Sequence, residues 1–425
     1  MDIKITPNTL NGTVKIPASK SLSHRAIIAA ALSQEPCVLH NVILSDDIFA
    51  TLTCMEQLGA QFTFDTTTLH VSKCEKLKDR TLHFECNESG STLRFLIPIA
   101  LTRYGNYHFQ GKGRLSKRPQ GEYIKIFESQ HIEYERLDAP LELPLKIVGA
   151  LRSGKFFLRG DISSQFITGL LFALPLLEGT SEIHLTTPLE SKAYVDLTLD
   201  VLNKFSIEVQ VTKGVYHIPG GQKFHASSYS VEGDYSQAAF WFVAGCLTKG
   251  SGIEIIGISN YSKQGDSAII EILKSCGAEL KELEGAVKVS SSEINGFECD
   301  LAQIPDLGPI LTVLACFAKG KSRLYNGTRL RIKESDRVTS MVTELSKMGA
   351  IIQEIGDEIH VEGKEFLEGG VTLSSWGDHR VAMALSIAAI RCKKSVVLTG
   401  AECVSKSYLK FWDDYKALGG VIDEL

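Results

Sequence analysis

The feature that most constrains the fold is a pattern that returns six times along the chain. Each copy has a helix-like segment, a tight turn and an extended segment, and the turns fall at Gly59, His131, Ser206, Gly277, Gly349 and Gly419. The intervals between these turns are 72, 75, 71, 72 and 70 residues. Four turns carry Gly, which readily adopts the left-handed conformation in which helices often end. Six units of this length account for the whole chain.

A second landmark repeats with the same period. It is a strongly apolar helix-like run with a polar lead-in, and its copies begin near residues 21, 90, 164, 235, 306 and 378. A helix that is apolar all round must be buried, whereas the segment before each turn is amphipathic. Short β-branched runs such as "SEIHLT" and "SVVLTG" predict strands between the helices. Because the period is much longer than that of solenoid repeats, we predict compact α/β domains.

Three units per domain would give two domains of similar size. We expect one domain to hold residues 1–14 and 232–425 and the other to hold residues 15–231. The chain would then cross between them twice, the second time near "SVEGDYS".

Composition limits the kind of protein. Apolar content of 44% and charged content of 22% are ordinary for a soluble protein. The net charge of −5 argues against binding to nucleic acid or to a membrane surface. The start, "MDIKITPNTLNG", does not resemble a signal peptide, and the apolar stretch "FITGLLFALPLL" is too short to span a bilayer. We therefore expect a cytoplasmic protein without nucleic-acid or membrane partners.

The ten cysteines are scattered and form no C-x-x-C motif, and no H-E-x-x-H motif is present. We interpret them as reduced, buried thiols and expect no metal site. The chain also contains no P-loop, no dinucleotide-binding G-x-G-x-x-G and no G-x-S-x-G hydrolase motif.

The polar lead-ins point to an anion. Ser, Asp and Gly there are good helix caps, but Lys20, Arg25, Arg94 and Arg380 are unfavourable beside the positive end of a helix. The conflict disappears if anions lie among them, because helix N-termini with Lys and Arg form phosphate and carboxylate sites. Further cations occur in "GRLSKRPQGE", "RLRIKESDR" and "SKSYLK", although each run alone could be a solvated surface.

Nine motifs, in order, resemble those of the 5-enolpyruvylshikimate-3-phosphate synthase family between residues 17 and 408. They are "PASKSLSHRA", "ESGSTLRF", "KRPQG", "GDISSQFITGLL", "SKAYVDLT", "IPDLGP", "RIKESDR", "WGDHRVAMA" and "AECVSKSY". The resemblance implies two domains, each of three β-α-β-α-β-β units around buried helices (an inside-out α/β barrel). It also implies an active site in the cleft between the domains, which would close over bound anions.

The implied reaction moves the enolpyruvyl group of phosphoenolpyruvate to the 5-hydroxyl of 3-phosphoshikimate and releases phosphate. The resemblance implies a monomer that uses no cofactor. The residues implied for 3-phosphoshikimate are Lys20, Ser21, Arg25, Ser163, Ser164, Gln165, Ser191, Tyr194, Asp306 and Lys333. Those implied for phosphoenolpyruvate are Lys20, Gly90, Arg118, Gln165, Arg337, Arg380 and Lys406. A side chain at position 90 would crowd this small ligand.

Two protons must move in this reaction. Asp306 is expected to accept the proton of the 5-hydroxyl, and Glu334 to protonate the methylene carbon, with Lys20 as its partner or rival. Which group performs which step stays open, and Asp306 could also cap the helix that follows it.

The chain departs from the family pattern at Ala18, Glu88, Arg329 and Leu409, where many members have Gly, Asn, Asn and Pro. Two alternatives are a UDP-N-acetylglucosamine enolpyruvyl transferase and a non-catalytic anion-binding protein. The first family carries a Lys-Asn pair and a loop cysteine, whereas this chain has Lys20-Ser21 and no cysteine in residues 113–122. The complete set of acidic and basic residues argues against the second.

Overall fold

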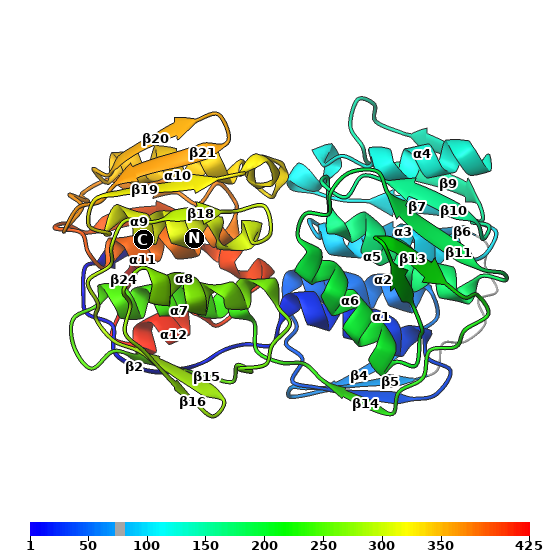
Figure 1. Cartoon of the computed structure of the whole chain (residues 1–425), viewed down its shortest axis with the longest axis horizontal. Coiled ribbons are helices and arrows are strands. Elements are labelled where there is room, and N and C mark those ends of the chain that lie inside the picture. The colour runs from blue at the N-terminus through cyan, green and yellow to red at the C-terminus, as the bar shows by residue number, and fades with distance from the viewer. Residues whose placement is uncertain (73–80) are drawn as a thin grey trace. The chain divides into compact units, whose positions relative to one another are not determined.

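A computed structural model describes residues 1–72 and 81–425, which form two compact units (Figure 1). Unit 1 comprises Met1–Ser19 and Glu232–Leu425, and unit 2 comprises Lys20–Val231. The first change-over lies five residues beyond the expected position between residues 14 and 15, and the second lies at the expected position between residues 231 and 232. Backbone pairing between the two crossing segments keeps residues 15–19 with unit 1. Ala18 forms a β-bridge with Gly233, and the Ser19 amide donates to the Glu232 carbonyl at 2.8 Å.

The elements of unit 2 form three four-stranded sheets with helices between the strands. The helices are α1 (Lys20–Leu32), α2 (Asp46–Gln57), α3 (Gly90–Ala100), α4 (Gly121–Gln130), α5 (Ser164–Ala173) and α6 (Lys192–Lys204), with 3₁₀ turns η1 (Gly113–Lys117) and η2 (Leu174–Leu176). The strands are β3 (Cys37–His40), β4 (Gln61–Asp65), β5 (Thr68–Ser72), β6 (Thr81–Glu85), β7 (Gly105–Gln110), β8 (Glu133–Arg136), β9 (Leu145–Gly149), β10 (Lys155–Leu158), β11 (Ser181–Leu185), β12 (Gln210–Thr212), β13 (Val215–Ile218) and β14 (Ser228–Ser230). The strand orders are β14-β3-β5-β4, β6-β7-β9-β8 and β10-β11-β13-β12.

Unit 1 repeats this plan. Its helices are α7 (Tyr235–Leu247), α8 (Ile269–Ser275), α9 (Gly308–Cys316), α10 (Arg337–Lys347), α11 (His379–Ala389) and α12 (Phe411–Ala417), with 3₁₀ turns η3 (Gly265–Ala268), η4 (Pro305–Leu307), η5 (Thr328–Ile332) and η6 (Ala401–Lys406). The strands are β1 (Asp2–Thr6), β2 (Gly12–Lys15), β15 (Ile253–Ile256), β16 (Leu280–Leu283), β17 (Ala286–Val289), β18 (Glu298–Asp300), β19 (Lys321–Tyr325), β20 (Ile351–Ile355), β21 (Glu358–Glu362), β22 (Thr372–Ser374), β23 (Val396–Thr399) and β24 (Val421–Glu424). The strand orders are β16-β17-β15-β2, β18-β19-β21-β20 and β22-β23-β1-β24.

Each sheet belongs to one repeat unit and has one parallel pair, such as β10 with β11 or β18 with β19. Strand β2 precedes α1 in the sequence but pairs with β15, and β14 precedes α7 but pairs with β3. Because the chain crosses between the units twice, the strand that precedes α1 belongs to a sheet of unit 1, and the strand that precedes α7 belongs to a sheet of unit 2. Strand β1 completes the last unit by pairing with β23 and β24. The predicted α/β repeat fold is confirmed.

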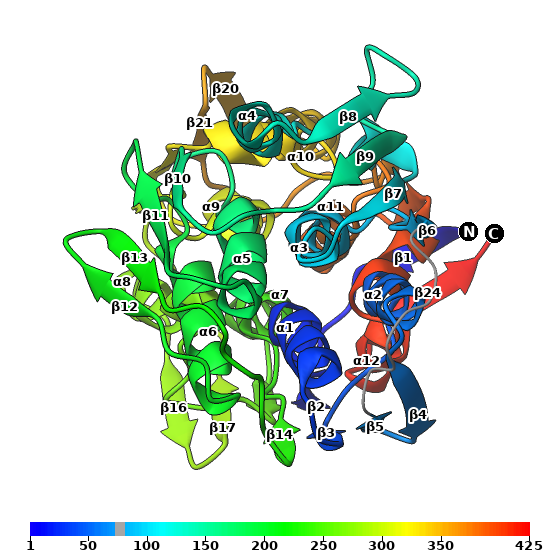
Figure 2. The same ribbon diagram turned by 90° about the vertical axis from the view of Figure 1, so that its right-hand side faces the viewer.

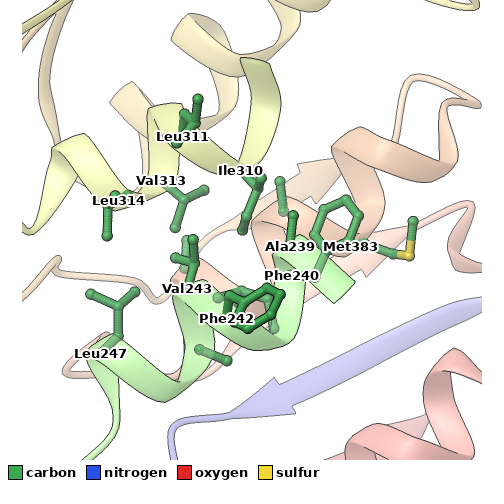
Figure 3. Close-up of a cluster of buried hydrophobic side chains, with 14 of the residues drawn as sticks. Ala239, Phe240, Phe242, Val243, Leu247, Ile310, Leu311, Val313, Leu314 and Met383 are labelled. Atoms are coloured by element: carbon green, nitrogen blue, oxygen red, sulfur yellow. The ribbon is translucent and has the colours of Figure 1, made fainter. Parts of the chain in front are cut away.

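The predicted apolar runs are buried helices. All residues of α7, α9 and α11 are buried, and Figure 3 shows Phe240, Val243, Ile310 and Met383 from these helices packed together. Helices α1, α3 and α5 have the same place in unit 2, inside its sheets (Figure 2). Burying each large apolar side chain contributes about 1.5–3 kcal/mol, so these helices are the main source of cohesion in each unit.

The turns keep the same geometry in all six repeat units. The four glycines have φ values from +91° to +99°, and the two other turn residues, His131 and Ser206, have φ of +57° and +64°. A left-handed conformation costs a residue other than Gly roughly 1–2 kcal/mol. The folded structure around His131 and Ser206 therefore offsets the cost of the left-handed conformation at these two turns without Gly.

Two further expectations concern cysteines and membranes. In the described residues the nine cysteines are buried free thiols, and Cys74 lies outside the described part of the chain. No helix among the described residues is long and apolar enough to cross a membrane.

Candidate active site

Unit 1 gathers acidic and basic side chains where α9, α10 and α11 begin. We call this group the acid–base cluster and define it as Asp306, Lys333, Glu334, Arg337, Asp378, His379 and Arg380. Asp306 lies in η4 before α9, and Arg337 is the first residue of α10. His379 and Arg380 open α11 directly after its cap, Asp378. The polar lead-ins of three helices thus supply most of the cluster.

Asp306 is surrounded by three cations. Arg337 Nη1 donates to its Oδ1 at 2.9 Å, and Arg380 Nη2 donates to its Oδ2 at 3.1 Å. Lys333 Nζ lies 3.3 Å from Oδ1. These charge-assisted contacts fix both carboxylate oxygens of Asp306.

Arg337 is buried between two carboxylates. Its Nε and Nη2 donate to Asp378 at 2.8 and 3.2 Å, and only 2% of the Arg337 side chain is exposed. Burial opposes the positive charge, but Asp378, Asp306 and Glu334 together raise the pKa of Arg337. Burial likewise opposes ionisation of Asp378, yet Arg337 outweighs it and lowers the pKa of this carboxyl group. Arg337 therefore stays charged and locks Asp306 and Asp378 in place.

Glu334 pairs with a buried histidine. Its Oε2 lies 2.8 Å from His379 Nδ1, and His379 is 1% exposed. Possible ligand atoms of Glu334, Asp378 and His379 lie within 4.8 Å of one another, the only such grouping in the described part of the chain. Because the guanidinium of Arg337 already occupies both oxygens of Asp378, these contacts fit a hydrogen-bond network better than a metal centre.

Lys406, predicted to bind phosphoenolpyruvate, lies at the end of η6. Its Nζ donates to the Gly377 carbonyl at 2.7 Å, directly before the cap of α11. The structure thus places Lys406 beside the loop that carries His379 and Arg380.

Unit 2 gathers hydroxyls and cations, and we call this group the hydroxyl–cation cluster. It consists of Lys20, Ser21, Arg25, Gly90, Arg94, Arg118, Ser163, Ser164, Gln165, Ser191 and Tyr194. Lys20 is the first residue of α1, and its Nζ donates to Asp47 Oδ2 at 2.9 Å. Asp47, which the sequence did not single out, lies in the first turn of α2.

Arg25 joins α1 to the start of α6. Its Nε donates to Thr198 Oγ1 at 2.9 Å, and its Nη2 donates to the Tyr194 carbonyl at 2.9 Å. Nη1 donates to the Ser21 carbonyl at 2.6 Å. Burial lowers the pKa of Arg25 to about 10, so the group still carries its charge at neutral pH. These bonds hold Ser21 and Tyr194 close to one guanidinium.

Arg94 has a role that the sequence did not reveal. The pattern of the lead-ins placed it among the anion-binding cations, but its buried side chain bonds Gln165 and the segment before α4. Nη1 donates to Gln165 Oε1 and Nη2 to the Pro119 carbonyl, both at 2.8 Å. Gln165 Nε2 in turn donates to Ser91 Oγ at 3.0 Å. Arg94 therefore orients Gln165 and holds the segment that carries Arg118.

Gly90 lies under the guanidinium of Arg118. A Cβ atom built at Gly90 would lie 2.8 Å from Arg118 Cζ, which is too close for a carbon–carbon contact. The expected reason for glycine was crowding of the ligand. The structure adds a second reason, because a side chain at this position would displace Arg118.

Three buried serines lie at the starts of two helices. Ser163 caps α5 and accepts a bond from the Gln165 amide at 3.3 Å, and Ser164 is the first residue of that helix. Ser191 precedes α6 in a left-handed conformation with φ of +51°. Helix N-termini present amide groups and a positive partial charge, which suits an anion such as a phosphate.

The overall fold is that of an enolpyruvyl transferase. The enolpyruvyl transferase NikO from Streptomyces tendae matches with a TM-score of 0.79 at 16% identity, over 99% of this chain and 98% of that chain. EPSP synthase from Acinetobacter baumannii matches with a TM-score of 0.82 at 23% identity, over all of both chains. At these identities the likeness establishes the fold.

Sequence comparison establishes the family. The family model of EPSP synthase (3-phosphoshikimate 1-carboxyvinyltransferase) matches residues 5–415, and the chain belongs to this family. A 3-phosphoshikimate 1-carboxyvinyltransferase from Clostridium acetobutylicum is 48% identical over 99% of this chain and 98% of its own length. One from Clostridium perfringens is 47% identical over 99% of both chains. The predicted family is confirmed, and the chain is a transferase of this family.

Proposed function

We propose that this chain transfers the enolpyruvyl group of phosphoenolpyruvate to the 5-hydroxyl of 3-phosphoshikimate and releases phosphate, as a monomer in the cytoplasm. The observation that carries the proposal is the match of residues 5–415 to the family model. The two clusters support it, because both substrates carry a phosphate and a carboxylate. One cluster offers cations, hydroxyls and helix N-termini, and the other offers carboxylates for proton transfer.

We assign 3-phosphoshikimate first to the hydroxyl–cation cluster. Its phosphate would bind to Ser163, Ser164 and Ser191. Tyr194 would lie near this phosphate, and the carboxylate would lie on the side of Ser21 and Arg25. Lys333 and Asp306 would meet its hydroxyls, and Lys20 and Gln165 would contact both substrates.

We assign phosphoenolpyruvate to Gly90, Arg118, Arg337, Arg380 and Lys406. Several guanidinium groups around a small anion fix its orientation by paired hydrogen bonds. Arg337 and Arg380 already bond Asp306, so an incoming phosphate would compete with this carboxylate for its cations. Binding of the phosphate would thus weaken the hold on Asp306 and make its oxygen a better proton acceptor.

The proposed chemistry has two stages. Asp306 accepts the 5-hydroxyl proton while the oxygen bonds to carbon 2 of phosphoenolpyruvate, and Glu334 gives a proton to its methylene carbon. Glu334 then takes back a proton from the new methyl group, the carbon–oxygen bond to phosphate breaks, and the leaving phosphate takes the proton from Asp306, which restores the double bond. Each positioned acid or base accounts for a factor of roughly 10²–10⁴. His379 holds the Glu334 carboxylate, and Lys20, held by Asp47, is the alternative proton donor.

We also propose that both clusters bind the same substrate pair and that the two units close over it. Bound anions would neutralise the cations of each cluster and so favour closure. Small-angle scattering with and without both substrates tests this, and equal compactness in the two samples would contradict closure.

A phosphate-release assay tests the function. Release that requires both phosphoenolpyruvate and 3-phosphoshikimate supports the proposal. Release with UDP-N-acetylglucosamine as the acceptor would assign the chain to the sister activity, and no release with either acceptor would indicate a non-catalytic protein.

A further inference from the structure

The loop between η5 and α10 is closed at its ends by an ion pair. Arg331 Nη1 donates to Asp336 Oδ2 at 3.0 Å, and residues 332–335 lie between these two side chains. We call this pair and the loop that it closes, residues 331–336, the clasp. It is a short closed ring of chain, and two of its four interior residues, Lys333 and Glu334, belong to the acid–base cluster.

Three consecutive residues inside the clasp each contact a different member of the acid–base cluster. Lys333 Nζ lies 3.3 Å from Asp306 Oδ1, Glu334 Oε2 lies 2.8 Å from His379 Nδ1, and Ser335 Oγ donates to Asp378 Oδ2 at 3.0 Å. A shift of this loop would therefore disturb three contacts at once. The positions of Lys333 and Glu334 depend on what holds the loop.

Arg331 anchors the clasp to a β-hairpin. Its Nε donates to Asp357 Oδ1 at 2.7 Å and its Nη2 to Glu354 Oε1 at 2.8 Å, and Nη2 also contacts the Gly356 carbonyl. Gly356 and Asp357 form the turn between β20 and β21, and Glu354 lies near the end of β20. Thr328 Oγ1 adds a bond to Asp357 Oδ2 at 2.6 Å. One guanidinium thus connects the loop to a sheet at several points.

Asp336 connects the clasp to α10. Its Oδ1 accepts a bond from the Thr339 amide at 3.1 Å and so caps the helix whose first residue is Arg337. The side chain that pairs with Arg331 therefore also fixes the start of the helix that presents Arg337 to Asp306 and Asp378.

We propose that Arg331 is a positioning residue of the reaction, which holds Lys333 and Glu334 in place by closing the loop and tying it to the β20–β21 turn. The inference rests on the proposed roles of Glu334 and Asp306. Lysine could not replace Arg331, because one ammonium group lacks the planar fork that bonds three carboxylates in fixed directions.

The test compares Arg331→Lys and Arg331→Ala with a matched control, Arg323→Lys. Arg323 also pairs with a carboxylate of this sheet: its Nε donates to Glu358 Oε2 at 2.8 Å. Its partners Glu358 and Glu298 lie on β21 and β18. Asp336→Asn is the second probe, because asparagine keeps the helix cap but removes the charge that closes the clasp.

Arg331→Lys and Asp336→Asn should lower kcat by about 10- to 100-fold with much smaller changes in the two KM values, because the loss is one of geometry. Arg323→Lys should keep kcat near the wild-type value. Ethylguanidinium should partly restore kcat of Arg331→Ala. Amide hydrogen exchange of residues 332–335 should be faster in Arg331→Ala than in the wild type, with or without substrates.

The proposal is overturned if folded Arg331→Ala keeps wild-type kcat, or if Arg323→Lys loses as much kcat as Arg331→Lys. Unchanged hydrogen exchange in residues 332–335 would also overturn it. If the wild-type protein releases no phosphate, the proposed function fails, and hydrogen exchange alone then decides whether the clasp holds the loop.

Discussion

Two buried arginines, Arg25 in unit 2 and Arg337 in unit 1, bond opposite kinds of partner. In unit 2, Arg25 donates to backbone carbonyls and to the hydroxyl of Thr198, which are uncharged acceptors. In unit 1, Arg337 donates to two carboxylates. The first arrangement leaves positive potential for an anion, and the second holds carboxylates in defined positions. We infer from the comparison that unit 2 binds the phosphate and carboxylate of 3-phosphoshikimate, whereas unit 1 supplies the proposed acid and base together with cations for phosphoenolpyruvate.

Lys20, which belongs to the same cluster as Arg25, pairs with a carboxylate, Asp47. It is also the residue of that unit for which we allow a part in proton transfer. The pairing of Lys20 with Asp47 agrees with the division between binding and proton transfer, because Lys20 is the alternative proton donor in the proposed reaction.

The largest expected effect concerns Asp306. Asp306→Asn removes the proposed base but keeps the shape of the side chain, so kcat should fall by roughly 10²–10⁴. The matched control is Asp300→Asn, at an exposed residue that bonds the Ala302 amide at 2.9 Å. Phosphate release measures both variants. A loss of less than tenfold in Asp306→Asn would break the assignment of proton transfer to unit 1.

The next prediction concerns pH and stability. Burial, and then Asp306, raise the pKa of Asp266 to about 7, and Arg380 partly offsets this. A raised carboxyl pKa stabilises the fold fully below its unfolded value near 4, and this stability is lost as the pH rises through 7. Between pH 5 and pH 8 the wild type should lose about 3 kcal/mol through this group, and Asp266→Asn should not.

Urea unfolding of both proteins at the two pH values measures this difference. A carboxylate of unit 2 should give the opposite pH dependence of stability, because a hydrogen bond from Arg159 lowers the pKa of Asp161 to about 2. Asp161→Asn should therefore be less stable than the wild type at neutral pH, and the difference should shrink as the pH falls towards 2. Equal pH dependence of Asp266→Asn and the wild type would contradict the account of Asp266.

The smallest effect concerns phosphoenolpyruvate binding in unit 2. Gly90→Ala should displace Arg118 and weaken charged hydrogen bonds worth about 1.5–3 kcal/mol, so KM for phosphoenolpyruvate should rise by one to two orders of magnitude. Affinity for 3-phosphoshikimate should change much less, and Arg118→Ala should show the same selectivity. The control is Gly121→Ala, where an added Cβ would meet nothing within 4 Å. Equal loss for both substrates would contradict the placement of Arg118.

Much of the fold could be predicted because local patterns encode it. The period of about seventy residues and the apolar runs located the buried helices, and the turns located the helix ends. The residue at which the chain first crosses could not be read from the sequence, because it depends on pairing between Ala18 and Gly233, which are 215 positions apart (233 minus 18). No local signal marks such a contact.

The site was predicted less completely. Asp306, Glu334, Arg337 and Arg380 stand in motifs and lie together in unit 1. His379 stands in the same motif as Arg380. Its place between two charged residues, Asp378 and Arg380, was the available signal that it belongs to the site. Other roles were missed because they depend on which side chains meet in three dimensions. Arg94 on Gln165, Asp47 on Lys20 and Arg331 on three carboxylates are contacts that spacing does not reveal.

The central claim, that unit 2 binds the phosphate of 3-phosphoshikimate and unit 1 supplies the groups that move protons, is tested most directly by a crystal structure with 3-phosphoshikimate. We expect its phosphate to contact the hydroxyls of Ser163, Ser164 and Ser191, and its 5-hydroxyl to lie within hydrogen-bond distance of the Asp306 carboxylate. A phosphate bound among Lys333, Arg337 and Arg380, with the ring away from Asp306, would contradict the claim.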